Sequence, residues 1–247
     1  MKISVVIPAY NAAASIADAI QSCMQQTMQP HEIIVVDDAS TDKTCDVVAQ
    51  YKDVILFKQA ANQGPSAARN RGIKEATGDV IAFLDSDDTW LAEKLAAVHD
   101  IFSKHDEVVY LGHPYMLSTE QKSARTKNLS TLSYTSVLLK NPYQPSCLAM
   151  RKSMPLRFDE SYRYCEDHEL SIRVAYQYKV HWLADAYTML GRPQLSTGGA
   201  SANVWKMRKG ELRLYSSVYK HNIIFLLLIP FLWIFSIGKM IRRLILK

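Results

Sequence analysis

The stretch Val80-Ile81-Ala82-Phe83-Leu84-Asp85-Ser86-Asp87-Asp88 joins an apolar run to a cluster of three carboxylates. An apolar run of this length is typical of a buried parallel strand, so the carboxylates fall where that strand ends. Crowded carboxylates repel one another unless a cation neutralises them, and dense oxygen ligands suit Mg2+ or Mn2+ holding the phosphates of a substrate. The stretch predicts such a metal site; the alternative is a solvated acidic turn before a helix that begins near Trp90.

The strands expected before this stretch also end in residues suited to binding. An apolar run at residues 3–7 is ended by Pro8-Ala9-Tyr10, in which a small residue beside an aromatic could seat a flat base. A second run at residues 33–36 ends in Asp37-Asp38, and both carboxylates precede any helix cap. The carboxyl ends of strands face the crevice where open α/β sheets bind ligands, so we expect a ligand role for this pair.

Helical patterns follow the strands. Apolar spacing predicts one helix from residue 16 to 24, a second that runs to about residue 51, and a third that Pro65 opens and that continues to about residue 76. Strands alternating with helices indicate an α/β fold, in which a mostly parallel, twisted sheet carries helices on both faces. The polar residues after the strands then share one crevice.

Four motifs resemble, in order and spacing, those of family 2 glycosyltransferases. They are Pro8-Ala9-Tyr10-Asn11, the run from Val36 to Asp42, the run from Asn62 to Asn70, and Asp85-Ser86-Asp87-Asp88. The resemblance is strong over residues 3 to about 112 and resumes at Glu166-Asp167. It implies the A-type glycosyltransferase (GT-A) fold, a nucleotide-sugar donor and inversion at the transferred sugar.

The resemblance also implies roles in the nucleotide site. Pro8-Ala9-Tyr10 would bind the base, with Tyr10 stacked on it, and Asp38 would accept the imide N–H of a uracil, because a carboxylate can only accept. Arg69, in the helix after Pro65, would reach the base or a phosphate. The alternative is that Arg69 lies on the surface of that helix.

The metal and diphosphate residues follow from the same resemblance. Asp85, with Ser86 beside it, would contact the ribose or the metal, and Asp87 would be the main ligand of Mn2+ or Mg2+, which neutralises the departing diphosphate. Asp88 would cap the next helix. Where family members often carry a histidine near the diphosphate, this sequence has Gln194, which makes Arg192 the expected diphosphate contact.

Asp167 is the expected general base, because an ionised carboxylate can take the proton from an acceptor hydroxyl as that oxygen attacks the anomeric carbon. One in-line displacement would invert the stereochemistry. The alternative is structural: Glu166 and Asp167 begin an expected helix, where carboxylates favour the helix dipole.

Composition and charge divide the chain in two. With 247 residues, 48% of them hydrophobic, it can bury a full core, and its four cysteines show no metal-type spacing. We expect a catalytic domain over residues 1–204, with a nucleotide-sugar half (1–112) and an acceptor half (113–204), and a tail over 205–247. Residues 113–143 carry no clear period and are expected to form an acceptor-side loop.

The tail combines basic charge with an apolar run. Residues 205–247 hold nine Lys or Arg against Glu211 alone, a balance of +8, which leaves −3 for residues 1–204. The apolar run from Ile223 is shorter than the roughly 20 residues of a membrane span and is interrupted by Pro230. We expect a helix lying in, or re-entering, the inner leaflet, with basic residues on anionic headgroups. A true span and packing on the catalytic domain are the alternatives.

The sequence thus predicts an inverting enzyme on the cytoplasmic face of the inner membrane, peripheral or monotopic. It would pass one hexose from a UDP-sugar, UDP-glucose or similar, to a lipid-linked, undecaprenyl-diphosphate saccharide in O-antigen, capsule or exopolysaccharide assembly. The alternatives are transfer to a polyprenyl monophosphate, or a non-catalytic, membrane-recruited nucleotide-binding protein. No nucleic-acid partner is expected, because the basic residues flank an apolar segment and lack interleaved stacking aromatics.

Overall fold

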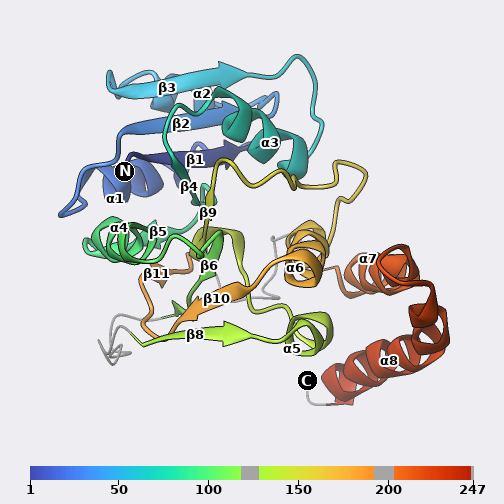
Figure 1. Ribbon diagram of the computed structural model, residues 1–247. Coiled ribbons are helices and arrows are strands. Elements are labelled where there is room, and N and C mark those ends of the chain that lie inside the picture. Colours follow the sequence, from blue (N-terminus) through green and yellow to red (C-terminus); the bar gives the residue numbers. More distant parts are fainter. Residues whose placement is uncertain (118–127, 192–202, 246–247) are drawn as a thin grey trace.

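The computed structural model describes residues 1–117, 128–191 and 203–245. Its centre is an eight-stranded sheet with the order β3-β2-β1-β4-β9-β6-β10-β8 (Figure 1). The strands are β1 Ile3–Ala9, β2 Glu32–Asp37, β3 Val54–Lys58, β4 Val80–Phe83, β6 Tyr110–Gly112, β8 Leu129–Leu132, β9 Leu148–Arg151 and β10 Val180–Leu183. Strands β1 to β4 are parallel and β10 is parallel to β6, whereas β9 and β8 run antiparallel to their neighbours. The predicted mostly parallel sheet is confirmed.

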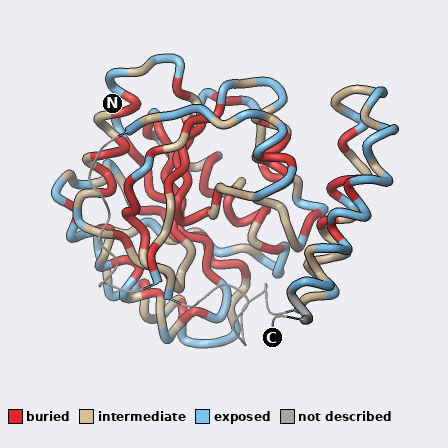
Figure 2. Tube along the Cα trace, turned by 90° about the horizontal axis from the view of Figure 1, so that it is seen from below, coloured by how far each residue is buried: buried red, intermediate tan, exposed pale blue. Residues whose placement is uncertain are grey.

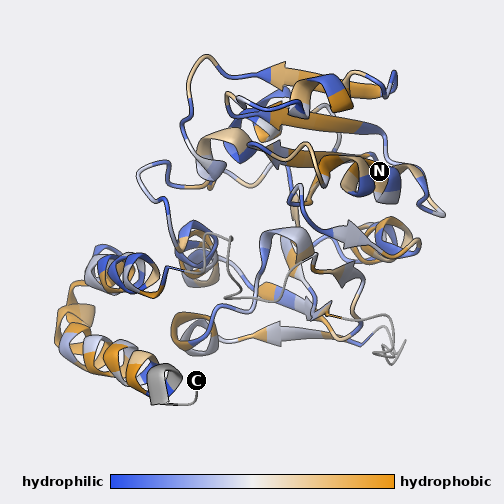
Figure 3. Ribbon diagram, turned by 180° about the vertical axis from the view of Figure 1, so that it is seen from behind, coloured by the Kyte–Doolittle hydropathy of each residue, from blue (hydrophilic) through white to orange (hydrophobic). Residues whose placement is uncertain are grey.

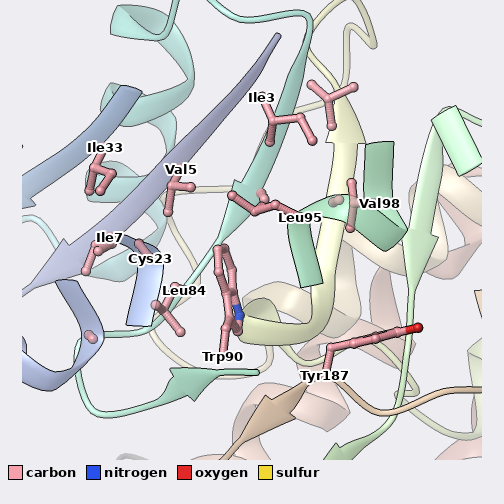
Figure 4. Close-up of a cluster of buried hydrophobic side chains, with 14 of the residues drawn as sticks. Ile3, Val5, Ile7, Cys23, Ile33, Leu84, Trp90, Leu95, Val98 and Tyr187 are labelled. Carbon is pink, nitrogen blue, oxygen red and sulfur yellow. The ribbon is translucent and has the colours of Figure 1, made fainter. Parts of the chain in front are cut away.

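Helices cover both faces of this sheet, as predicted. They are α1 Ile16–Met24, α2 Thr44–Val48, α3 Pro65–Glu75, α4 Lys94–Lys104, α5 Tyr134–Leu139 and α6 Glu166–Gln177. Because side chains alternate along a strand, Val5 of β1 packs in a cluster with α1 and α4, whereas Val6 packs in another with α3 and α6. Figure 4 shows the first cluster around Trp90 and Leu95, and the buried segments run through the centre of Figure 2.

Two boundaries differ from those expected. Strand β1 continues through Pro8 to Ala9. The odd-numbered residues of β1 bond to β2, so Pro8 faces the β4 side, where pairing has already ended at Val6 and no hydrogen bond is lost. The helix expected near Trp90 begins instead at Lys94, because residues 89–90 form the short strand β5.

A second, three-stranded sheet lies beside the first, with the order β5-β11-β7. Its strands are β5 Thr89–Trp90, β7 Tyr115–Met116 and β11 Thr188–Met189. Together with β8 and α5, β7 gives regular structure to parts of residues 113–143, where a loop was expected. Strands β9 and β10 pair with β4 and β6, so the two predicted halves of the catalytic domain share one sheet.

The chain ends in an antiparallel helical hairpin, α7 Val204–Ser217 and α8 Ile229–Ile245, joined by the short 3-10 helices η3 Val218–Lys220 and η4 Ile223–Leu228. The hairpin projects from the α6 side of the molecule (Figures 1 and 2), and apolar residues cover much of α8 (Figure 3). Pro230 lies in the first turn of α8, where a proline is tolerated, so it does not interrupt the helix. Residues 223–242 are long and apolar enough to cross a membrane, and little of them is buried.

Candidate functional site

The carboxyl ends of β1, β2 and β4 lie along one edge of the sheet, and predicted donor-site residues follow each of them. Tyr10 follows β1, Asp38 follows β2, and Asp85 lies just past β4. Pro8 and Ala9 are buried, whereas Tyr10 is 50% exposed, and its stacking on a base stays a prediction. The Asp38 N–H donates to the Ala9 carbonyl at 2.8 Å, which ties the ends of β1 and β2 together.

Backbone strain gathers beside the site. Asn11, Ala39 and Cys165 adopt the left-handed region with φ of 49°, 60° and 61°. Asparagine tolerates this conformation, but alanine and cysteine adopt it at a cost. Ala39 follows Asp38, and Cys165 precedes Glu166. Strained residues persist where surrounding contacts hold them, and they concentrate at binding and catalytic sites.

The Asp38 carboxylate binds the loop that leads into α3. Its Oδ1 accepts from Gln59 Nε2 at 2.6 Å and its two oxygens accept the N–H groups of residues 63–64 at 2.7 Å each. Since each carboxylate oxygen can accept two hydrogen bonds, Oδ2 keeps one position for the imide N–H of a uracil, and that role stays a prediction. Asp37 is buried and accepts the Ser40 N–H at 3.1 Å, so its described contact supports the turn.

The turn Asp85-Ser86-Asp87-Asp88 is anchored by Ser146, in the 3-10 helix η1 Pro145–Cys147. The Asp85 N–H donates to Ser146 Oγ at 3.0 Å, and that hydroxyl donates to Asp88 Oδ2 at 2.5 Å. The Gly191 N–H donates to the other Asp88 oxygen at 3.0 Å. The prediction that Asp88 caps the next helix is wrong, because α4 has a different N-cap residue and Asp88 holds the turn itself.

This turn is negatively charged and tightly packed. Burial, with the carboxylates of Asp85 and Asp87, raises the pKa of Asp88 to about 7, although hydrogen bonds from Ser146 and Gly191 oppose the shift. Asp85 and Asp87 therefore both lie close enough to Asp88 to repel its charge. A Cβ at Gly191 would lie 1.8 Å from the Asp87 carbonyl oxygen, so only glycine fits against the turn.

Arg69 joins the two predicted parts of the site. It is buried, with Nη2 2.7 Å from Asp85 Oδ1 and Nη1 3.0 Å from Glu166 Oε1. Burial opposes its charge, but the two carboxylates outweigh burial and raise the pKa of Arg69. Its guanidinium also lies over the ring of Phe158, 5.3 Å from the centroid. The alternative of a surface position is excluded; contact with a base or phosphate stays a prediction.

Asp167 lies in the first turn of α6, where the sequence placed it. Its Oδ1 accepts the N–H of His168 at 2.8 Å, and its Oδ2 accepts from Asn141 Nδ2 at 2.7 Å. Burial raises the pKa of Asp167, and the Asp85 carboxylate adds to the rise, while those two hydrogen bonds and Arg69 oppose it. Burial and Asp167 likewise raise the pKa of Glu166. A raised pKa makes Asp167 a stronger base than an ordinary aspartate.

The residues past β4 fit a divalent cation shared with a substrate. Asp85, Ser86 and Asp87 are partly exposed, in contrast to Asp88. Within the described ranges, no group of three or more His, Cys, Asp or Glu side chains could enclose a metal. Mg2+ at phosphate-binding sites is usually held by one or two carboxylates and completed by substrate phosphates and water. Asp85 and Asp87 provide that donor set.

The sequence analysis did not single out Ser146, Gly191 or Asn141. The roles expected of Arg192 and Gln194 fall outside the described residues. Ser146 and Asn141 reach the site from positions far along the chain. Glycine at 191 was the one signal available, because a glycine beside an acidic turn permits close backbone approach.

Comparisons with known proteins identify the family of the chain. The profile of Glycosyl transferase family 2 matches residues 4–159. An uncharacterized glycosyltransferase of Haemophilus influenzae is 30% identical over 234 residues, which cover 88% of this chain and 92% of the relative. Escherichia coli WfaP, a UDP-Glc:alpha-D-GlcNAc-diphosphoundecaprenol beta-1,3-glucosyltransferase, is 42% identical over 96 residues, 38% of each chain. The match thus covers under two fifths of the Escherichia coli relative.

Solved structures share the fold. S. aureus TarS in complex with UDP-GlcNAc superposes with a TM-score of 0.71 at 21% identity, over 89% of this chain and 67% of TarS. The mannosyltransferase PcManGT from Pyrobaculum calidifontis, in complex with GDP-Man and Mn2+, gives a TM-score of 0.66 at 17% identity, over 96% of this chain and 73% of the neighbour. These likenesses confirm the predicted GT-A fold.

Proposed function

The chain belongs to glycosyl transferase family 2, and from this premise we propose that it transfers one hexose from a UDP-sugar to a saccharide carried on a lipid diphosphate. The observation that carries the proposal is the Asp85–Arg69–Glu166 ion-pair bridge. It joins the acidic turn, which suits a cation-bound nucleotide diphosphate, to the helix whose first turn carries the proposed base. Donor and acceptor groups are thereby held in one site.

The donor end of the site suits a uracil nucleotide. The exposed ring of Tyr10 can stack on a base, and Oδ2 of Asp38 has an acceptor position left for an imide N–H. Two relatives support a UDP-sugar: WfaP is named for UDP-Glc, and TarS was solved in complex with UDP-GlcNAc. Asp87, with Asp85, would hold Mn2+ or Mg2+. When bound, the cation neutralises charge on the diphosphate.

Asp167 would act as general base in one inverting displacement. Its Oδ1 and Oδ2 each use one acceptor position within the protein, so each keeps another for an acceptor hydroxyl. As the acceptor oxygen forms its bond to the anomeric carbon, the hydroxyl proton passes to the carboxylate, and the bond from that carbon to the nucleoside diphosphate breaks. Glu166 stays paired with Arg69 and positions the start of α6.

The hairpin suits an acceptor in a membrane. The outer face of η4 and α8 exposes large apolar side chains, among them Leu227, Phe231 and Ile234 at 73%, 70% and 68%. The inner face buries Leu232 but also carries a polar pairing: Ser236 donates to Glu211 of α7 at 2.8 Å, and Lys239 pairs with the same carboxylate. A helix that spanned the bilayer would draw this polar pairing into the hydrocarbon, so we assign α8 a position along the surface of the inner leaflet.

The test is a donor and acceptor screen with purified protein and Mn2+. We expect turnover with a UDP-hexose and a synthetic lipid-diphosphate sugar, none with GDP-mannose, and little with a polyprenyl monophosphate. In the Asp167→Asn variant turnover should fall at least about a hundredfold while UDP binding holds, because the amide cannot take a proton. Wild-type turnover in that variant would move the base elsewhere. UDP binding without turnover on any lipid acceptor would favour a non-catalytic nucleotide-binding protein.

A further inference from the structure

Asn141 contacts the proposed base from outside every motif of the sequence. It lies in the loop after α5, and its Nδ2 donates to Asp167 Oδ2 at 2.7 Å. Its own Oδ1 accepts the N–H of Tyr143 at 3.2 Å. This second bond fixes which end of the amide faces Asp167, because a flipped amide would set an oxygen against a carboxylate and leave the Tyr143 N–H without its partner.

The loop that carries Asn141 is held on its far side by Tyr143. That side chain is fully buried, its hydroxyl donates to the His181 carbonyl at 3.2 Å, and its ring meets Tyr110 edge-on with centroids 5.0 Å apart. Gly112 permits this position, since a Cβ there would lie 2.2 Å from the Tyr143 ring. The loop therefore cannot move away from α6 without disturbing the core.

A second contact fixes the near side of the loop. His168, the residue after Asp167, bonds through Nε2 to the Val137 carbonyl of α5 at 2.7 Å. Helix α5 ends at Leu139, two residues before Asn141, so α6 is bonded both to α5 and to the loop that follows it. The buried Tyr143 on one side and the contact between α5 and α6 on the other thus fix the place of Asn141. Residues that support a catalytic side chain are typically fixed in this way.

The donors on Asp167 define the plane of its carboxylate. One oxygen takes the His168 N–H and the other takes Asn141 Nδ2. With both bonds in place the carboxylate cannot rotate freely, and its remaining lone pairs have a fixed direction. A neutral amide donor also orients the group without the full charge of a lysine or arginine, which would depress its basicity much more.

The charged groups around Asp167 are placed by other contacts, so a neutral donor, Asn141, is the group that orients its carboxylate. Glu166 is adjacent on α6, Asp85 faces Asp167 from the end of β4, and Arg69 of α3 lies between those two carboxylates. Tyr110 of β6 and Cys165 also face it, both neutral because burial raises the pKa of each.

We propose that Asn141 is a positioning residue that holds the Asp167 carboxylate in the orientation in which it takes the proton of the acceptor hydroxyl. The proposal rests on the proposed function, in which Asp167 is the base. The described hydrogen bonds of Asn141 go to Asp167 and Tyr143, and to none of the residues proposed to bind the nucleotide or the metal, so we expect its substitution to change the chemical step and not UDP binding.

Four variants test the proposal in the full-length protein. Asn141→Ala removes the donor; Asn141→Asp keeps the shape but sets a second carboxylate against Asp167; Asn141→Gln restores an amide on a longer chain. Asn128→Ala is the matched control, because Asn128 is exposed and its described hydrogen bond is made by its backbone carbonyl. For each we would measure kcat, KM for acceptor, the Kd for UDP with Mn2+, and the melting midpoint.

We expect kcat to fall about tenfold in Asn141→Ala and further in Asn141→Asp, with partial recovery in Asn141→Gln, while the Kd for UDP stays within about twofold. The acid limb of the kcat profile should move to higher pH in Asn141→Ala, since a donor to the charged form is lost. A purely structural role would instead lower the melting midpoint and raise the Kd for UDP, and that result would overturn the proposal.

A double variant separates the role proposed for Asn141 from the proposal that Asp167 is the base. If Asn141 acts through Asp167, then Asn141→Ala should cost nothing more in an Asp167→Asn background. An unchanged tenfold loss in that background would overturn the proposal and leave Asp167 as base. Full activity of Asp167→Asn alone would instead remove the proposed base, whatever the Asn141 variants do.

Discussion

At the scale of single residues, the site has more carboxylates than cations, and one buried arginine pairs with two of those carboxylates. Of the three carboxylates past β4, Asp85 pairs with the Arg69 guanidinium, which also binds Glu166. The sequence predicted the carboxylates and Asp167, because each directly follows a strand or begins a helix. It could not predict Asn141 or Ser146, since neither stands at a predicted element boundary and each reaches its partner across a long stretch of chain.

The Asp87 side chain gives the first prediction. Asp87→Ala, or chelation of wild type with EDTA, should abolish transfer and weaken UDP binding, because the diphosphate loses the cation that neutralises it. Isothermal titration of UDP with and without Mn2+ measures the effect. Asp46→Ala, an exposed carboxylate in α2, is the control and should bind normally. Undiminished turnover in a metal-free assay would rule out the metal assignment.

The raised pKa of Asp167 gives the second prediction. Asp167 must be ionised to take a proton, so activity should be lost as pH falls through its folded pKa, at a pH above the ordinary aspartate value of about 4. Burial, together with repulsion from Asp167, also raises the pKa of Glu166. Glu166→Gln removes one negative charge and frees the Arg69 charge, so the acid limb of kcat should move to lower pH. A limb that moves upward would contradict this arrangement.

At the scale of elements, boundaries were harder to predict than the elements themselves. Pro8 was expected to end β1, but a proline is tolerated where the neighbouring strand has already stopped. The residues after the acidic turn were expected to enter a helix at once; they pair with β11 instead. Both outcomes depend on where partner strands begin and end, which the local sequence does not contain.

Gly191 gives a prediction at this scale, because it joins the end of β11 to the acidic turn. Gly191→Ala would place a Cβ within 1.8 Å of the Asp87 carbonyl oxygen, so the turn must shift. We expect a loss of about 1–3 kcal/mol in unfolding free energy and weaker Mn2+-dependent UDP binding. Urea unfolding measures the loss in unfolding free energy, and titration with UDP and Mn2+ measures the binding. Gly238→Ala in α8 is the matched control, since nothing lies within 4 Å of its Cβ and alanine favours a helix.

At the scale of the whole molecule, charge and apolar surface are separated. Residues 205–247 carry +8 and residues 1–204 carry −3. An anionic membrane attracts the hairpin and repels the catalytic domain, which would orient the molecule with the hairpin towards the lipid. The sequence indicated this tail from its composition. It misjudged Pro230, because position within the helix, and not the presence of proline, decides whether a helix is broken.

The fourth prediction concerns this surface. Deleting α8 would strip Glu211 of Ser236 and Lys239, so paired substitutions on the outer face are a cleaner test. Phe231→Ser with Ile234→Ser should reduce binding to anionic vesicles at least about a hundredfold, because two large side chains lose their burial in lipid. Co-sedimentation measures it. Ile55→Ser, exposed on β3, is the control.

UDP binding should be unchanged in the paired variant, and high salt should release wild type only in part, since screening affects the headgroup contacts and not the apolar ones. Wild-type protein that stays in solution beside anionic vesicles at low salt would count against the membrane position of α8.

The outward apolar face of α8 bears on how the enzyme finds its acceptor. An enzyme held on a lipid sheet searches in two dimensions, and its encounter rate follows the local density of acceptor molecules, not their amount per litre. Diluting the acceptor with inert lipid at constant bulk concentration would therefore slow the enzyme. The turnover rate would therefore depend on the surface density of acceptor saccharides in the membrane.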